Sequence, residues 1–177
     1  MRFHYKYYLF ISALLVLSAC SNKSSDEQVA AWYMETKEEI LNQADETPDS
    51  TFEYIDLNTG MFEKWYYYEK RPVKYEVSDA NKTLRYAALY AEDTSFSLVK
   101  EYCQHGNLSY EGIEYKHRPY GTATWYDCET GKVIRQGNRF KFKKTGVWKQ
   151  YNTDGTVKSE IRYEGKIKTK KLPRLDS

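Results

Sequence analysis

One turn sequence recurs along the chain at nearly constant spacing, and this repeat constrains the fold more than any other feature. Gly106, Gly131 and Gly155 each lie in a turn-forming sequence, with separations of 25 and 24 residues, and Asn81 lies 25 residues before the first of them. After glycine, asparagine is the residue that most readily adopts the left-handed conformation of such turns. The four positions therefore predict four repeats.

Strand signals keep the same register around these four anchors. An aromatic residue comes four or five residues before three anchors and eight or nine residues after all four, and an aliphatic residue comes two residues after three of them. A second glycine recurs 25 residues apart, at Gly121 and Gly146. Alternation of apolar and polar residues over 157–163 predicts a strand. The residues in register are Tyr90, Tyr102, Leu108, Tyr115, Tyr126, Val133, Phe140, Tyr151, Val157 and Tyr163.

Strands joined by short turns pair with their neighbours in sequence and run antiparallel. The predicted fold is therefore mainly β: an antiparallel β-meander of hairpin repeats over residues 52–166, with a period of about 25 residues and the clearest repeats at 96–166. Residues 62–78 are expected to add another hairpin, one without a glycine anchor.

An N-terminal α-helix is predicted over residues 26–46. Ser25 to Gln28 has the form of a capping box, and Thr47-Pro48 ends the helical pattern. We expect this helix to cover the apolar surface of the first hairpin; the alternative is a helix that binds a partner. Its apolar face comprises Val29, Trp32, Tyr33, Ile40, Leu41 and Ala44.

The first 19 residues have the form of a signal peptide. A basic start precedes the apolar run Leu9 to Ala19, which is shorter than the ~20 residues that a membrane span needs. The sequence Leu17 to Cys20 resembles the bacterial lipobox, which implies that Cys20 is lipidated and begins the mature chain, followed by a polar linker over 20–25. Ser21 implies a location at the periplasmic side of the outer membrane in a Gram-negative cell.

The pattern G-x-W-x-x-Y-x-x-x-G-x-V, followed by E-x-x-Y-x-G-K, resembles the MORN repeat in the divergent bacterial form of YwqK-like antitoxins. The resemblance covers residues 100–166 well and 77–99 weakly. It implies a sheet of hairpins that acts by binding, as an antitoxin or immunity protein does. The matching residues are Gly146, Trp148, Tyr151, Gly155, Val157, Glu160, Tyr163 and Gly165, then Gly121, Tyr126, Gly131, Val133 and Phe140, then Tyr102, Gly106, Leu108, Glu111, Gly112 and Tyr115.

Cys103 and Cys128 would be the two thiols left after lipidation, and two arguments about them disagree. An oxidising compartment favours a disulfide. Both residues, however, lie three residues before an anchor glycine, which places them two strands apart at roughly 9–10 Å, whereas a disulfide needs Cα atoms within about 7 Å. Both residues lie beside turns, one of which carries an inserted residue, so the sequence favours the bond by a small margin.

Catalytic and metal-binding motifs do not appear in the sequence. The two histidines of the mature chain, His105 and His117, lie in or near turns, and neither belongs to a zinc-binding pattern. No nucleophile elbow or phosphate-binding loop is present. We therefore expect no enzyme, no metal and no cofactor, and the net charge of +2 argues against a nucleic-acid binder.

Charge and aromatic content point to binding surfaces. Residues 131–177 hold fourteen Lys and Arg against four Asp and Glu, while residues 21–130 hold eleven against twenty-one. The basic tail over 167–177 is expected to contact anionic lipid or an acidic protein, or to be a solvated edge that prevents aggregation. The candidate residues for an anionic surface are Lys166, Lys168, Lys170 and Lys171.

The rings give the second candidate surface. Adjacent tyrosines in the sequence Trp65 to Glu69 must point to opposite faces of a strand, so one sheet cannot hide all of them. Exposed rings mark contact sites. The partner-binding candidates are Trp125, Tyr126, Trp148, Tyr151 and Tyr163.

The sequence thus predicts a non-enzymatic, lipid-anchored envelope protein that binds another protein, an immunity protein against a toxin being the expectation that the resemblance supplies. The alternatives are a module that binds an anionic membrane surface and a purely structural lipoprotein.

Overall fold

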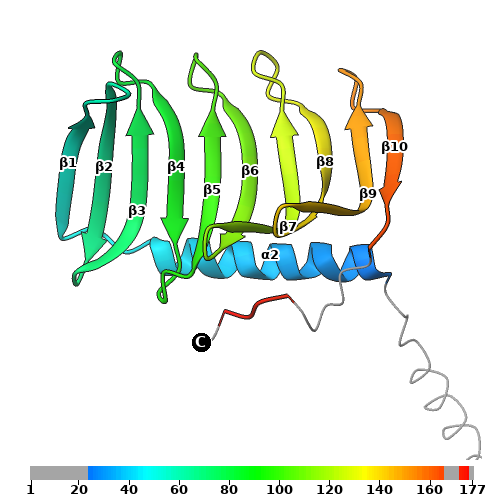
Figure 1. Ribbon diagram of the computed structural model, residues 1–177, viewed down its shortest axis with the longest axis horizontal. Coiled ribbons are helices and arrows are strands. Elements are labelled where there is room, and N and C mark those ends of the chain that lie inside the picture. The colour runs from blue at the N-terminus through cyan, green and yellow to red at the C-terminus, as the bar shows by residue number, and fades with distance from the viewer. Residues whose placement is uncertain (1–23, 166–171, 176–177) are drawn as a thin grey trace, which may run out of the picture.

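The chain forms an antiparallel sheet of ten strands with a long helix lying across it (Figure 1). The computed structural model describes residues 24–165 and 172–175. Each strand pairs with its neighbours in sequence, which confirms the predicted β-meander and N-terminal helix. The elements are α2 (Ser25–Ala44), β1 (Ser50–Asp56), β2 (Met61–Tyr68), β3 (Arg71–Ser78), β4 (Leu84–Tyr90), β5 (Phe96–Tyr102), β6 (Leu108–Tyr115), β7 (Arg118–Tyr126), β8 (Val133–Phe140), β9 (Lys143–Tyr151) and β10 (Val157–Tyr163).

Helix α2 begins with a capping box, one residue earlier than the sequence suggested. The Ser24 hydroxyl accepts a hydrogen bond from the Glu27 amide at 3.3 Å, and the Glu27 carboxylate accepts one from the Ser24 amide at 2.7 Å. The prediction that Ser25 opens the box was wrong: Ser24 with Glu27 and Ser25 with Gln28 both fit the capping-box pattern, and the structure uses the first pair.

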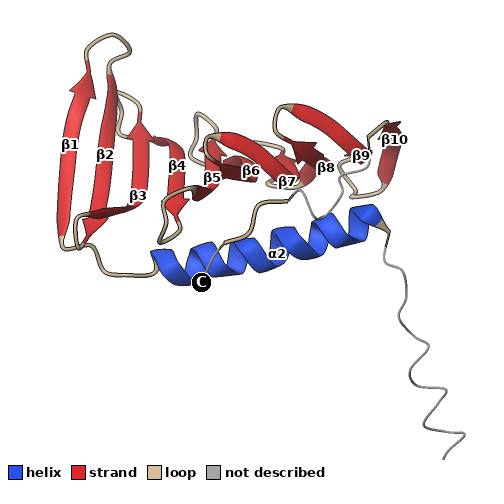
Figure 2. Cartoon of the chain, turned by 60° about the horizontal axis from the view of Figure 1, so that its bottom comes forward, coloured by secondary structure: helices blue, strands red, loops and turns tan. Residues whose placement is uncertain are grey.

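The length of α2 matches the width of the sheet that it crosses. Twenty residues at about 1.5 Å each make a helix of about 30 Å. The six strand spacings from β3 to β9, at about 4.8 Å each, make about 29 Å. The main contacts of α2 are with β3, β4, β5, β7 and β9, and Figure 2 shows the helix running across the strands on one side of the sheet. The expectation that the helix covers the first hairpin was therefore wrong, since β1 and β2 lie beyond these contacts.

The apolar core lies between α2 and the adjacent face of the sheet, called here the helix face. Leu98 and Ile113 are cross-strand partners on this face and are fully buried with Ile40 of the helix. Thr36 is also buried, whereas Leu41, predicted to lie on the apolar side, is 39% exposed. The helix therefore buries residues at spacings of three and four, and those residues are Val29, Tyr33, Thr36 and Ile40.

A buried polar cluster fixes the helix on the sheet. The Tyr33 hydroxyl donates a hydrogen bond to the Glu111 carboxylate at 2.9 Å, and the Lys37 ammonium lies 2.5 Å from the same oxygen. Burial and the neighbouring Glu111 charge raise the pKa of Tyr33, so the hydroxyl keeps its proton and remains a donor. Since Glu111 is 6% exposed, loss of either partner would leave a buried charge poorly satisfied.

The edge of the sheet farther from α2, called here the glycine edge, carries the turns that the repeat predicted. The left-handed residue of the first predicted turn is Lys82 with φ of 62°, so the assignment of Asn81 as anchor was wrong by one residue. The Lys82 amide bonds to the Asp79 carbonyl at 2.8 Å, as the Gly106 amide bonds to that of Cys103 at 2.9 Å. Gly60, which sequence reasoning passed over, gives this edge a fifth such turn between β1 and β2.

The second repeated glycine makes room for the helix. A Cβ at Gly121 would lie 2.5 Å from the Trp32 ring, and a Cβ at Gly146 would overlap the Asp26 carboxylate. Asp26 and Trp32 are six residues apart, about 9 Å along a helix, which matches the spacing of roughly 9–10 Å between β7 and β9. The 25-residue glycine repeat therefore allows the helix to approach the backbone of the sheet closely at two successive hairpins.

Aspartates in the turns of the glycine edge make the stability depend on acid pH. Hydrogen bonds, chiefly from the Asn58 amide, the Thr130 amide and the Thr156 hydroxyl, hold the pKa values of the Asp56, Asp127 and Asp154 carboxyls below their ordinary value of 3.8. A lowered folded-state pKa stabilises the fold above the unfolded-state pKa, and this contribution disappears as pH falls through the folded-state value.

We expect the urea midpoint of unfolding to fall between about pH 6 and pH 2, and to fall less in Asp127→Asn and Asp154→Asn, whose amides keep an acceptor without the charge. Thr153→Ala, next to Asp154 but outside the hydrogen bonds that lower its pKa, serves as the control. An acid loss of the same size in the Asn variants and the parent would contradict this explanation.

Candidate functional site

The face of the sheet opposite α2, called here the ring face, carries two groups of packed aromatic side chains. Ring centroids lie 4.3 Å apart for Trp65 and Tyr75, 5.1 Å for Tyr110 and Trp125, and 5.4 Å for Trp125 and Trp148. Such distances are those of favourable ring pairs. The members of the ring face are Trp65, Tyr75, Tyr86, Tyr90, Tyr110, Trp125, Trp148 and Tyr163.

Small residues beneath the rings let them lie flat on the sheet. Ala88, Gly112, Ala123 and Gly137 fall in one cross-strand row, interrupted by Val99. A Cβ at Gly137 would overlap the indole of Trp148, and one at Gly112 would lie 2.9 Å from Cζ of Tyr110. The rings therefore cover backbone that would otherwise be open to water.

Three cations stand over the rings at the C-terminal half of this face. The guanidinium of Arg135 lies 4.1 Å from the Trp125 ring centroid and that of Arg139 lies 5.4 Å from it, while the Lys144 ammonium lies 4.7 Å from the Trp148 centroid. These are cation–π distances. The surface is called here the basic ring patch and comprises Tyr110, Trp125, Arg135, Arg139, Lys144, Trp148 and Tyr163.

Two donors of the basic ring patch have no acceptor within the described part of the chain. The Nε atoms of Arg135 and Arg139 are buried and make no hydrogen bond there. A buried donor without an acceptor is costly, and the cost is greater when the group is charged.

The opposite half of the ring face is acidic. Glu63 accepts a hydrogen bond from the Tyr75 hydroxyl at 2.6 Å, and Glu101 stands between Tyr86 and Tyr110 in one cross-strand row. Burial raises the pKa of Tyr110 to about 12 and also raises the pKa of the Glu114 carboxyl. The ring face thus changes from acidic to basic along the sheet.

The structure brings together three of the five predicted partner-binding residues. Trp125, Trp148 and Tyr163 lie on the ring face, with Trp148 only 4% exposed. Tyr126 and Tyr151 do not lie there. Because side chains alternate between the two faces along a strand, both of these tyrosines lie on the helix face. Tyr151 lines a cavity of about 460 Å³ beside the first turn of α2, together with Asp26, Gln136 and Arg162.

Sequence reasoning missed the cations of the basic ring patch. Arg135 and Arg139 flank Gly137 at spacings of two, so all three share the ring face with Trp125. The signal was present as the alternation Arg-x-Gly-x-Arg in β8, but it became visible only when the register placed these residues beside the tryptophans of β7 and β9.

Part of the predicted basic tail returns to the helix. Leu172 is 7% exposed and packs with Val29 and Tyr120, and the Trp32 indole donates a hydrogen bond to the Pro173 carbonyl at 2.9 Å. The signal peptide, Cys20 and the candidate lysines lie outside the described residues; these lysines are Lys166, Lys168, Lys170 and Lys171.

The two histidines that the sequence offers as metal ligands lie in turns at opposite edges of the sheet. His105 lies in a turn of the glycine edge and His117 in the turn between β6 and β7, on the other edge. Within residues 24–165 and 172–175, no group of three His, Cys, Asp or Glu side chains could hold a metal ion. Among the same residues, no helix is long and apolar enough to cross a membrane.

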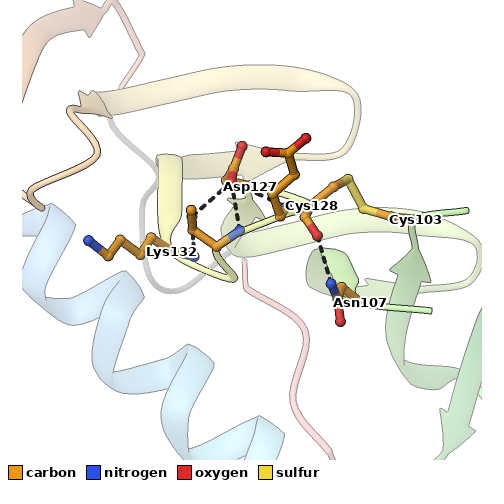
Figure 3. Close-up of a disulfide and its surroundings, with 7 residues drawn as sticks. Cys103, Asn107, Asp127, Cys128 and Lys132 are labelled. Carbon is orange, nitrogen blue, oxygen red and sulfur yellow. Dashed lines mark hydrogen bonds between the residues drawn. A yellow bond between two sulfur atoms is a disulfide. The ribbon is translucent and has the colours of Figure 1, made fainter. Parts of the chain in front are cut away.

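A disulfide joins Cys103 and Cys128 across two turns of the glycine edge (Figure 3). Their Cα atoms are 5.8 Å apart, and the Asn107 side chain donates a hydrogen bond to the Cys128 carbonyl at 2.7 Å. The spacing of roughly 9–10 Å that argued against a bond applies within the strands. Both cysteines lie in turns beyond the strand ends, where the two chain segments come closer together than they do within the strands.

The comparisons with known proteins leave the chain without a family. No family model and no curated protein matches it. Two solved structures are similar: TarM, with a TM-score of 0.39, and a mutant of S. aureus TarM in complex with Fondaparinux, alpha-GlcNAc-glycerol and UDP, with a TM-score of 0.38. Each is 10% identical and matches 91% of this chain, which spans only 32% of the TarM chain. A similarity of this degree supports no inference about activity.

We expect Gly137→Ala to lower the free energy of unfolding by about 1–3 kcal/mol, because the added methyl group would displace the Trp148 indole. The backbone at Gly137 is not left-handed, so the cost should come from packing alone. In a Trp148→Leu background the same change should cost clearly less, as a double-mutant cycle in urea would measure. Equal costs in both backgrounds would show that the ring does not rest on this glycine.

Loss of the disulfide should destabilise the sheet without changing its fold. The bond closes a loop with a sequence separation of 25, for which about 3 kcal/mol is expected from the entropy of the unfolded chain. The double variant Cys103→Ser and Cys128→Ser, compared with the parent in urea unfolding, measures this loss, and a reducing agent should lower the parent to the level of the variant. A parent that is insensitive to reduction would contradict the expectation.

Proposed function

We propose that this chain is a non-enzymatic envelope lipoprotein that binds a partner protein through the basic ring patch. The observation that carries the proposal is the position of Arg135 and Lys144 directly over the rings of Trp125 and Trp148. Arginine and aromatic residues are the side chains that most often dominate the energy of protein interfaces.

The chemistry of the patch favours a partner that presents carboxylates. Arg135, Arg139 and Lys144 lie within one small area, and the rings beneath them exclude water from one side. A carboxylate placed there would meet fixed donors in a poorly hydrated setting, where charged hydrogen bonds are stronger than in water. Aspartate or glutamate side chains on a folded partner fit this description.

The role of the complex rests on the resemblance of the repeats to YwqK-like antitoxins. An immunity protein neutralises its toxin by binding alone, so it needs a rigid surface and no catalytic group. Lipidation at Cys20 would hold the protein at the periplasmic side of the outer membrane, where it would meet an incoming toxin. The excess of Lys and Arg after residue 131 favours a second candidate, binding to an anionic membrane surface.

A crosslinked pull-down of the lipidated chain from its own cells, followed by mass spectrometry, distinguishes these two functions. One stoichiometric protein with an acidic surface would support the interaction function and identify the partner. Recovery of anionic lipid together with abundant envelope proteins only would reject it in favour of membrane binding.

Adjacent lysines on opposite faces of β9 supply a matched pair of variants. Lys144 stands over the Trp148 and Tyr163 rings, whereas Lys143 pairs with Phe140, which packs on the helix-face core. We expect Lys144→Gln to weaken binding of the recovered partner roughly tenfold, about 1–2 kcal/mol, and Lys143→Gln to leave it unchanged. Calorimetry with the full chain measures both. Equal effects of the two variants would place the partner on another surface.

A further inference from the structure

Within the described residues, the two terminal strands of the sheet are open edges. β1 and β10 each pair with one neighbour and stand at opposite ends of the sheet (Figure 1). Among the described residues, six of the ten large apolar side chains that are exposed lie on these strands or directly after β1. They are Phe52, Tyr54, Ile55, Leu57, Val157 and Ile161. The exposed apolar surface is therefore concentrated where backbone donors and acceptors are also free.

Strand β1 has none of the usual features that protect an edge. It contains no Lys and no Pro, and its seven pairs with β2 follow one unbroken register from Ser50↔Tyr67 to Asp56↔Met61. Native sheets usually protect an edge with a bulge, a proline or a lysine. β1 thus offers an unbroken edge with exposed rings, whereas β10 carries Lys158 and a register shift between Val157 and Ser159.

The two edges carry opposite charges. Residues 45–63 hold six Asp and Glu residues and no Lys or Arg. β10 carries Lys158, Glu160 and Arg162, a net charge of +1, and the Arg162 side chain, which lies 3.8 Å from the Asp26 carboxylate, is 70% exposed. Pairing of β1 with another β1 would bring acidic strands together, whereas pairing of β1 with β10 brings acidic and basic strands together.

Strand direction favours the same pairing. Neighbouring strands are antiparallel throughout, so the first and tenth strands run in opposite directions. A second copy placed beside the first by translation and twist would therefore set its β1 antiparallel to β10 of the first. The helix faces of the two copies would be continuous, since Glu53 and Arg162 both lie on the helix face. The ring faces would be continuous as well, since Phe52 and Tyr163 both lie on the ring face.

We propose that a second copy of this chain pairs its β1 with β10, joining the two sheets head to tail into one continuous meander. In the proposed register, Arg162 lies opposite Glu53 of the next copy. The same register sets Tyr163 opposite Phe52 and Ile161 opposite Tyr54 of that copy. The contact is heterologous, so it repeats without closing and builds an open series of copies. The right-handed twist of the sheet makes that series helical.

Sedimentation velocity on the full chain, purified in a mild non-ionic detergent, tests the proposal. We expect species larger than the monomer whose size grows continuously with protein concentration. Arg162→Glu alone and Glu53→Arg alone should each abolish these species, and the two changes combined should restore them. The matched controls, Arg118→Glu and Glu38→Arg, reverse equally exposed charges away from both edges and should change nothing.

Three results would overturn the proposal: a monomer at every concentration, a closed dimer that neither reversal affects, or a double variant that stays monomeric although both single variants melt like the parent. Where a reversed variant fails to fold by circular dichroism, Glu53→Gln and Arg162→Gln take its place, and each should still reduce assembly.

Discussion

A single-layer sheet must keep water from two faces with one chain, and every other feature of this structure depends on how that is done. On one face, α2 supplies the apolar cover and buries Leu98, Ile113 and Ile40. On the other, the sheet covers itself, because tryptophan and tyrosine rings lie flat across Gly112, Gly137 and the small residues between them. A flat aromatic ring that lies over a glycine covers more backbone than a branched aliphatic side chain could cover.

The two solutions leave different surfaces for contact. The helix face is closed by a long element that is tied down by Glu111, Tyr33 and Lys37, so little of it remains for a partner. The ring face has no second layer within the described part of the chain, and its cations lie directly on its rings. Electrostatic complementarity and aromatic contact are therefore available at one place, which is how interface hot spots are usually composed.

Local sequence patterns predicted the elements of the fold but not their long-range contacts. Turn chemistry at Gly106, Gly131 and Gly155 was sufficient for the meander, because a short turn leaves the next strand one place to go. The placement of α2 was missed, since it depends on contacts such as that of Trp32 with Gly121, far apart in sequence. For the same reason alternation alone could separate Trp125 from Tyr126 but could not assign the tryptophan to the face that also carries Arg135. The sequence favoured the disulfide by only a small margin because strand spacing argued against it, and that spacing does not apply to residues that lie in turns.

The match between α2 and the sheet also bears on how such a chain can change its size. In most repeat proteins each unit contacts only its neighbours, so units can be gained or lost with little effect elsewhere. Here a duplicated hairpin would widen the sheet by roughly 9–10 Å and would remain uncovered unless α2 also grew by about six residues. Duplication of one stretch of the gene cannot supply both changes, because the helix and the hairpins are encoded apart. The length of one helix thus limits the number of repeats that it can cover, and β1 and β2 already extend past it.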